Sequence, residues 1–289
     1  MPNNARSKLF GWKRAVVDRL ATAGAVFAAV LVIVPLLAIF VYLVARGAGA
    51  LSWSFLTNAP KPVGETGGGI GNAMAGSALI LGISCLIGVP LGIGAGIYLA
   101  EYGRGKTALL VRFIADVLNG VPSIVMGMAV YALVVLQQKH FSALAGGLAL
   151  GVMMIPTVTR ATEEMLLMVP RSIREAALGL GVAEWRTVLS VSLRTALPGV
   201  ITGIMLAFAR VAGETAPLLF TAFGNQFWNW NLNQPTAALP LQIYTYAISP
   251  YDEWHQQAWA GALVLIVTIV GTVAIVRLVA NRGVMKGTS

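Results

Sequence analysis

Long, uninterrupted apolar runs constrain the fold of this 289-residue chain more than any other feature. A helix needs about 20 apolar residues to cross a bilayer, and several runs reach that length. Only 11% of the residues are charged, whereas a soluble domain carries about 25%. The sequence therefore predicts an all-α integral membrane protein. The candidate spans lie at about 21–44, 72–99, 117–136, 143–160, 196–220 and 258–280.

The Lys and Arg residues lie almost entirely on one side of these predicted spans. The other side carries only Arg46, Lys61 and Lys139, and Arg210 lies inside a span. Loops rich in Lys and Arg face the cytoplasm, so we expect both termini there. The net charge of +9 follows from this asymmetry and needs no nucleic-acid partner. The residues on the expected cytoplasmic side are Arg6, Lys8, Lys13, Arg14, Arg19, Arg104, Lys106, Arg112, Arg160, Arg171, Arg174, Arg186, Arg194, Arg277, Arg282 and Lys286.

The expected cytoplasmic loop between the fourth and fifth spans contains a short helical motif. From Arg171 to Gly181 it reads Arg-Ser-Ile-Arg-Glu-Ala-Ala-Leu-Gly-Leu-Gly. Its Arg, Glu, Ala and Leu residues are good helix formers, whereas Gly179 and Gly181 stop a helix after about two turns. We expect a short helix across the membrane surface, with a face of small residues that fits a groove of another protein.

The fifth span carries two charged residues, Arg210 and Glu214, four positions apart. This spacing puts both on one face of a continuous helix. A central Arg costs about 2.5–3.5 kcal/mol to insert, so it faces water, an opposite charge or a substrate and not lipid. Two interpretations stay open: a mutually neutralising structural pair, or a polar patch on a translocation path. Thr215 adds a hydroxyl and Pro217 frees a backbone carbonyl, so we expect a local polar break here.

Gly88, Gly92 and Gly96 recur at four-residue steps and share one face of the second span. Helix backbones can approach closely across such a face. The partner is either another helix of this chain or a second subunit, and the spacing fits both.

Few residues of this sequence offer chemistry of their own. Cys85 is alone in an apolar span, where we expect it to pack, and His140 and His255 lie far apart without metal-ligand spacing. The run 103–107 ends in Gly-Lys-Thr, but a phosphate-binding loop needs a buried strand before it, and here a membrane span precedes it. We therefore expect no catalytic residue, no metal site and no nucleotide site.

The last outer loop, at about 221–257, has no Lys or Arg and is rich in Trp and Tyr. Such a composition is typical of an aromatic belt at the membrane interface. Aromatic side chains also anchor protein interfaces, so a docking surface for another protein is the alternative.

The run Glu175-Ala176-Ala177, followed by Gly181, resembles the signature loop of bacterial ABC importer permeases. In that family the loop forms the coupling helix that docks on a cytoplasmic ATPase. The resemblance therefore implies an ATPase-coupling role for Arg174, Glu175, Ala176, Ala177 and Gly181. The family pattern ends in Leu-Pro, whereas here the matching positions are Leu193-Arg194. This departure leaves open the angle at which the loop joins the fifth span.

A narrower resemblance lies in the fifth span. The run from Arg210 to Ala222 reads Arg-Val-Ala-Gly-Glu-Thr-Ala-Pro-Leu-Leu-Phe-Thr-Ala and is similar to the PstA family of phosphate ABC importer permeases. The runs 94–103 and 253–261 are similar to the same family, so the likeness covers most of the chain from about Gly67. It implies a phosphate path that includes Arg210, Glu214 and Thr215.

The resemblance also implies the surroundings of this chain. The expected partners are inorganic phosphate, the lipid bilayer of the bacterial inner membrane, a second permease of the PstC type, an ATPase dimer of the PstB type and an extracytoplasmic binding protein of the PstS type. The chain itself is expected to hold no cofactor, because the partner ATPase uses the ATP and Mg. The alternatives are a permease for molybdate or sulfate, and a secondary transporter that works without ATP. The Glu-Ala-Ala loop favours the ATP-driven class, because an ion-driven carrier needs no docking helix.

The implied fold is the six-helix type I permease fold of ABC importers, with both termini cytoplasmic. We expect a cytoplasmic tail at 1–20 and a first transmembrane helix with its outer loop at 21–66. The importer domain is expected at 67–282, with the coupling helix near 174–182, and a cytoplasmic tail at 283–289.

Overall fold

A computed structural model describes the backbone of residues 4–285 and the side chains of residues 16–280. The described chain is helical apart from its loops and one isolated β-bridge, between Phe223 and Thr236. This confirms the predicted all-α class. The helices are α1 (Asn4–Gly47), α2 (Trp53–Thr57), α3 (Gly71–Ile97), α4 (Gly105–Gly120), α5 (Ser123–Val130), α6 (Leu136–Gln138), α7 (Ala143–Leu167), α8 (Arg171–Gly179), α9 (Glu184–Thr187), α10 (Leu193–Ala212), α11 (Ala216–Thr221), α12 (Leu239–Ala247) and α13 (Asp252–Met285).

Short segments of other helix types join several of these helices. A 3₁₀ turn, Ala48–Ala50, follows α1. π-Helical segments extend α3 (Tyr98–Tyr102), link α5 to α6 (Tyr131–Val135) and link α9 to α10 (Val188–Ser192). The chain therefore runs as one helix from Glu184 to Ala212 and does not break at Arg194.

Five helical stretches of the described chain are long and apolar enough to cross a membrane. They confirm the predicted spans at about 21–44, 72–99, 143–160 and 258–280, and the fifth predicted span up to Ala212. The stretches are Val16–Ala50, Gly71–Tyr102, Ala143–Leu167, Glu184–Ala212 and Asp252–Ala280.

The third predicted span, at about 117–136, is sharply bent in the structure. The chain bends by 106° between Gly105–Gly120 and Ser123–Gln138. Val121 is extended (φ −69°, ψ 131°) because a residue before proline is disfavoured in the helical conformation, and Pro122 follows it. The two arms pass the length and hydropathy requirements together, as one broken span or as a re-entrant element.

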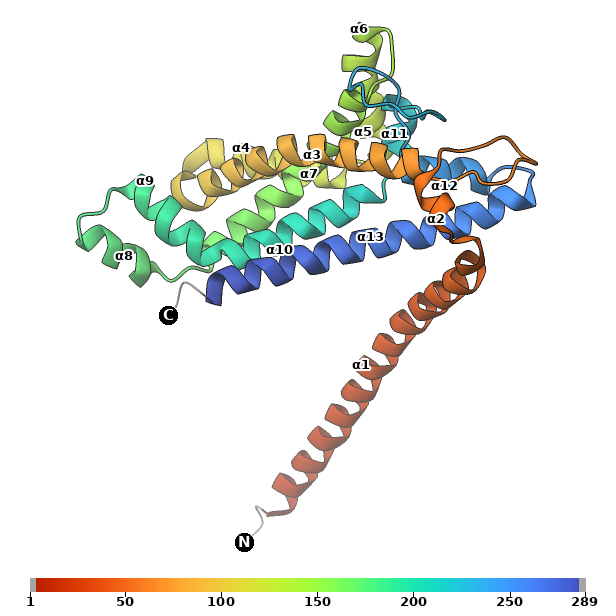
Figure 1. Ribbon diagram of the computed structural model, residues 1–289. Coiled ribbons are helices and arrows are strands. Elements are labelled where there is room, and N and C mark those ends of the chain that lie inside the picture. The colour runs from red at the N-terminus through yellow and green to blue at the C-terminus, as the bar shows by residue number, and fades with distance from the viewer. Residues whose placement is uncertain (1–3, 286–289) are drawn as a thin grey trace.

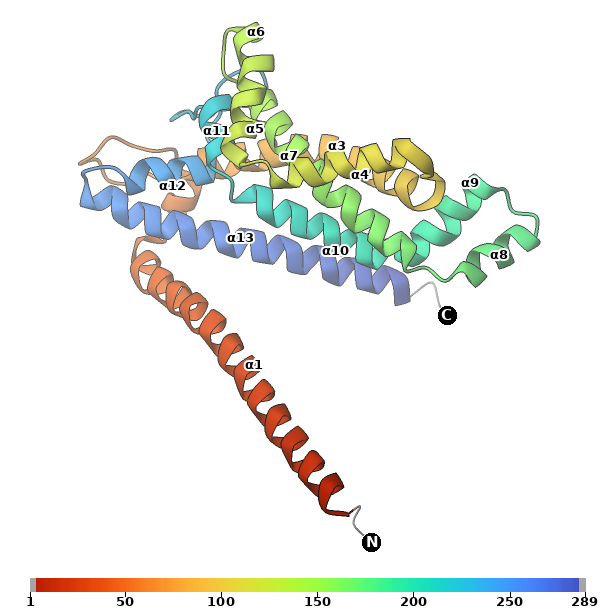
Figure 2. The same ribbon diagram turned by 180° about the vertical axis from the view of Figure 1, so that it is seen from behind.

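Four helices form the body of the molecule: α3, α7, α10 and α13 run alongside one another (Figure 1). The short helices α8 and α9 lie at one end of this bundle and α2 and α12 at the other, and the reverse view shows the same arrangement (Figure 2). The arm formed by α5 and α6 projects sideways together with α11. The core lies where α3, α7 and α10 meet, around Ile80, Leu150, Met154, Val158 and Val211.

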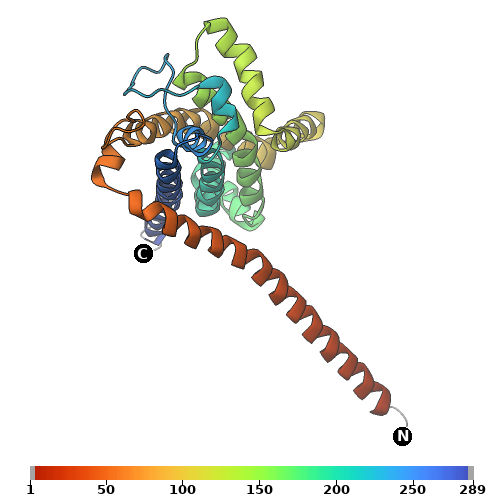
Figure 3. The same cartoon turned by 90° about the vertical axis from the view of Figure 1, so that its right-hand side faces the viewer.

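Helix α1 diverges from the bundle (Figure 3). It contacts α13 through its last turns, where Leu43 is buried and Tyr42 packs edge-on against Trp259 at 5.3 Å between ring centroids. The helix begins at Asn4, so most of the predicted tail at 1–20 is helical. Residues 1–3 of that tail, and 286–289 of the predicted tail at 283–289, lie outside the described residues.

The glycine stripe of α3 packs within the chain, against α7. A Cβ at Gly88 would lie 2.7 Å from that of Met154, one at Gly92 2.6 Å from that of Val158, and Gly96 is equally close to Thr162. All three glycines are buried. Of the two interpretations of this stripe, the intrachain one is confirmed.

Because of this close approach, we expect Gly92→Val to lower the stability of the purified protein by roughly 1–3 kcal/mol, the usual cost of overpacking. The matched control is Gly94→Val, in the same helix, because a Cβ at Gly94 would have nothing within 4 Å. Thermal unfolding in detergent measures both. Equal midpoints for the two variants would contradict the packing described here.

Candidate functional site

The Glu-Ala-Ala motif forms a two-turn helix, α8, that ends as its glycines predict. The amide of Gly181 donates to the carbonyl of Leu178 at 2.9 Å, and the amide of Val182 donates to that of Ala177 at 3.2 Å. Gly181 has φ +80°, in the left-handed region where a side chain is strained. A glycine is therefore needed at this position to turn the chain toward α9.

The two alanines of this motif differ in their burial. Glu175 and Ala176 are exposed, together with Leu178 and Leu180. Ala177 is only 8% exposed and packs toward its own chain. The exposed surface of α8 is thus built on Glu175, Ala176 and Leu178, whereas Ala177 packs beneath it.

Arg174, the other predicted coupling residue of α8, also points into the chain. Its Nη2 lies 2.8 Å from Oε1 of Glu101 and donates to the carbonyl of Leu166 at 2.6 Å. Its Nε donates to Oγ of Ser192 at 3.2 Å. The side chain is 19% exposed and that of Glu101 is 9% exposed. Arg174 therefore fixes α8 to the ends of the spans.

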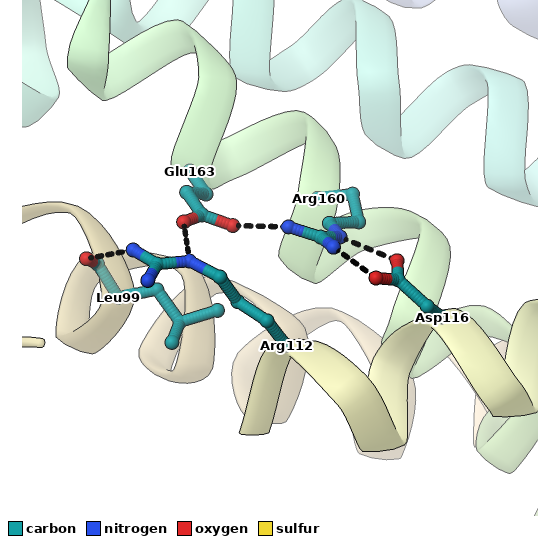
Figure 4. Close-up of polar contacts among 5 residues, drawn as sticks. All are labelled: Leu99, Arg112, Asp116, Arg160 and Glu163. Carbon is teal, nitrogen blue, oxygen red and sulfur yellow. Dashed lines mark hydrogen bonds and ion pairs between the residues drawn. The ribbon is translucent and has the colours of Figure 1, made fainter. Parts of the chain in front are cut away.

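A second set of charges joins α4 to α7 (Figure 4). Glu163, 3% exposed, accepts from Nε of Arg112 at 2.6 Å and from Nη1 of Arg160 at 3.0 Å. Arg160 also binds the carboxylate of Asp116, through Nε at 2.9 Å and through Nη2. Arg112 donates in addition to the carbonyl of Leu99 at 3.2 Å. The four charges form a neutral chain of ion pairs.

Arg112 and Arg160, which the sequence predicts on the cytoplasmic side of the spans, both lie on helices and not in loops. Arg112 lies in α4 and Arg160 in α7, which extends to Leu167. The spacing of each Arg from a nearby carboxylate could have indicated from the sequence that both lie on helices. Arg112 and Asp116 are four residues apart and Arg160 and Glu163 three apart, the spacings that put side chains on one helix face.

The fifth span breaks where its charged residues lie. Helix α10 ends at Ala212 and α11 begins at Ala216, so the polar break is confirmed, but Arg210 and Glu214 do not share a continuous helix. Pro217 lies in the first turn of α11, where its missing N–H costs nothing, whereas inside a longer helix it would leave a carbonyl without a donor.

The break leaves the predicted path residues accessible to different degrees. Arg210 is exposed in the last turn of α10, and Glu214 and Thr215 are half-buried in the connection. Arg210 and Glu214, whose side chains the structure describes, form no ion pair with each other. Arg210 therefore lies at the end of a helix, and Glu214 and Thr215 lie in the non-helical connection that follows it.

The end of the bundle opposite α8 carries the aromatic loop. Asn72 of α3 donates to the carbonyl of Asn225 at 2.9 Å and so holds the loop on the bundle. Beside it, Tyr246 and Trp254 stack at 4.7 Å and line a cavity of about 280 Å³. Burial raises the pKa of the Tyr246 phenol, which stays protonated and accepts from Gln242. The aromatic belt and the docking surface both stay predictions.

Comparison with known proteins identifies the family. Residues 88–283 match the family described as "Binding-protein-dependent transport system inner membrane component". The protein named phosphate transport system permease protein PstA of Yersinia pestis is 49% identical over 223 residues, which cover 77% of this chain and 76% of that protein. The protein of the same name from Haemophilus influenzae is 48% identical and covers 77% and 79%. The chain belongs to the PstA family of binding-protein-dependent transport permeases. It is thus a multi-pass inner-membrane transport subunit of a permease family.

Solved structures show the same fold. A MetNI methionine ABC transporter in inward-facing conformations aligns with a TM-score of 0.57 at 18% identity, over 75% of this permease and 96% of that chain. An amino acid ABC transporter crystallised with histidines aligns with a TM-score of 0.53 at 17% identity, over 74% and 92%. At this identity the likeness concerns the fold alone, and it confirms the predicted ABC importer permease fold.

Proposed function

We propose that this permease passes inorganic phosphate across the inner membrane as one subunit of an ATP-driven importer. The observation that carries the proposal is the exposed Arg210 at the broken end of α10, in a chain whose relatives are named phosphate transport permeases. Phosphate groups carry close to two negative charges near pH 7. A guanidinium offers a permanent charge and a planar fork of donors that suits their oxygens.

Glu214 and Thr215 complete the proposed substrate contact. Both are half-buried in the connection that follows Arg210. A carboxylate there accepts a hydrogen bond from a phosphate hydroxyl and at the same time reduces the positive field of Arg210. The contact is therefore weak and short-lived, which transport requires, because an anion held tightly in the path leaves slowly. The threonine hydroxyl supplies one further neutral hydrogen bond.

The energy for transport enters through α8. The exposed face of Glu175, Ala176 and Leu178 is proposed to sit in a groove of a PstB-type ATPase dimer, which uses the ATP and Mg. This places α8 and both termini in the cytoplasm, as the Lys and Arg distribution predicts. A PstC-type permease completes the path, and a PstS-type protein delivers phosphate at the opposite end. The chain itself hydrolyses nothing.

Reconstitution tests this function directly. In liposomes that contain the chain with its partner permease and ATPase, and with the binding protein added outside, we expect uptake of labelled phosphate that requires ATP. An excess of sulfate or molybdate is expected to leave it unchanged. Uptake that proceeds equally without ATP would support a secondary transporter. Strong inhibition by sulfate or molybdate would indicate another oxyanion as the cargo.

The difference in burial between Ala176 and Ala177 tests the docking surface. In a Cys85→Ala background, which removes the single native thiol, Ala176→Cys is expected to cross-link to the ATPase through a maleimide–succinimide reagent. The matched control is the neighbouring Ala177→Cys, buried at 8% exposure, which is expected to react several-fold more slowly. Equal adducts at both positions, or none at Ala176→Cys in an assembled complex, would contradict the docking surface.

A further inference from the structure

The polar contacts of Arg174 reach the ends of three spans. Its guanidinium pairs with Glu101 in the π-helical extension of α3, at 2.8 Å. It also donates to Leu166, at the end of α7, and to Ser192, in the π-helical segment that leads into α10. Single π-helical turns occur frequently at functional sites. One side chain of α8 thus connects this helix to two such segments.

The link to α3 differs from the other links of α8. The backbone joins α8 to α7 through residues 168–170 and to α9 through residues 180–183. Helix α3 lies about seventy residues upstream, so no adjacent backbone joins it to α8. Among the described residues, the ion pair with Glu101 is the polar contact between α8 and the extension of α3. The pair is therefore a direct polar link between α8 and the extension of α3.

The same π-helical segment passes the connection onward. Leu99, two residues before Glu101, accepts a hydrogen bond from Arg112 of α4. Arg112 binds Glu163 of α7, which binds Arg160, and Arg160 returns to Asp116 of α4 (Figure 4). The π-helical segment Tyr98–Tyr102 is therefore connected to α3, α4 and α7 together. Separating the charged partners of this network costs free energy, so the network resists displacement of the segment.

We propose that the Arg174–Glu101 ion pair is the joint through which α8 moves α3, so that its loss lets the ATPase turn over without moving cargo. The inference rests on the proposed function, because it takes α8 as the element that the ATPase moves. Arg174 and Glu101 are positioning residues in this scheme. They touch neither the cargo nor ATP, and they set how much substrate each turnover carries.

The test measures phosphate taken up per ATP hydrolysed by the complete reconstituted transporter. In Glu101→Gln and in Arg174→Gln we expect this ratio to fall by about fivefold or more, the size of a usual coupling between sites. ATP hydrolysis and co-purification with the ATPase are expected to stay near those of the unaltered protein. The matched control is Glu164→Gln, an exposed carboxylate of α7 at the same end of the bundle, which is expected to keep the ratio.

Exchanging the charges of Glu101 and Arg174 distinguishes an ion pair that transmits movement from two residues that act independently on the fold. The double variant Glu101→Arg with Arg174→Glu is expected to recover at least part of the ratio that each single change loses. An unchanged ratio in the single variants would overturn the proposal, and so would a loss that the exchange leaves unrepaired. Failure of a single variant to assemble would also overturn it, since the pair would then maintain the fold. Absence of ATP-dependent phosphate uptake by the unaltered transporter would instead refute the proposed function.

Discussion

Replacing Arg210 by Ala is expected to reduce phosphate uptake by the assembled transporter about 100-fold or more, because the proposed contact with phosphate would lose hydrogen bonds to a charged group, worth about 1.5–3 kcal/mol each. The side chain is exposed in the last turn of α10, so its removal creates no cavity. Stability and assembly with the ATPase are therefore expected to stay close to those of the unaltered protein. Labelled phosphate uptake in liposomes measures the effect, and co-purification of the ATPase confirms assembly.

Two further variants define what Arg210 contributes. Arg210→Lys keeps the charge and loses the planar fork, so uptake is expected to fall between that of the unaltered protein and that of Arg210→Ala. The matched control is Arg194→Ala, an exposed Arg at the opposite end of the same helix, which leaves the break at Gly213–Thr215 untouched. Uptake by Arg210→Ala at the rate of Arg194→Ala would show that Arg210 does not contact the cargo.

The sequence predicts the spans well where hydropathy alone decides them. The span at 143–160 extends in the structure to Leu167, and the one at 72–99 agrees closely, because uninterrupted apolar residues in lipid have helix as their stable form. At 117–136 hydropathy finds the apolar stretch but not its bend, since it averages over Val121 and Pro122 and carries no information on the direction in which the chain leaves a helix. The 106° bend is a property of backbone angles at that pair of residues.

The site is predicted less completely because its decisive contacts join distant parts of the chain. The motif correctly indicates the helix 171–179 and its glycine stop. It does not indicate that Arg174 turns inward, because that depends on Glu101, in a different span. The sequence shows Arg112 and Arg160 only as charges near the ends of predicted spans. Their burial depends on Glu163, whose carboxylate becomes a partner of Arg112 only when α4 packs on α7.

Glu163→Gln is expected to destabilise the protein by about 3 kcal/mol, the lower end of the cost of breaking a buried ion pair. The substitution keeps the shape and removes the charge that two Arg side chains share. Arg160 retains its ion pair with Asp116, whereas Arg112 loses its charged partner and retains its hydrogen bond to the carbonyl of Leu99. The loss stays at the lower end because the side chain of Arg112 is 36% exposed and water replaces part of the contact.

Chemical unfolding in detergent measures this loss of stability. Glu164→Gln provides the matched control, because the neighbouring carboxylate of Glu164 is exposed. This control is expected to change stability by less than about 0.5 kcal/mol. The double variant Glu163→Gln with Arg112→Gln leaves no unpaired cation, so it is expected to be more stable than the sum of the single losses predicts. Strict additivity of the two substitutions would show that Arg112 and Glu163 do not stabilise each other. Because Asp116 is 58% exposed and Glu163 is buried, Glu163 is the member of the network on which the α4–α7 contact depends.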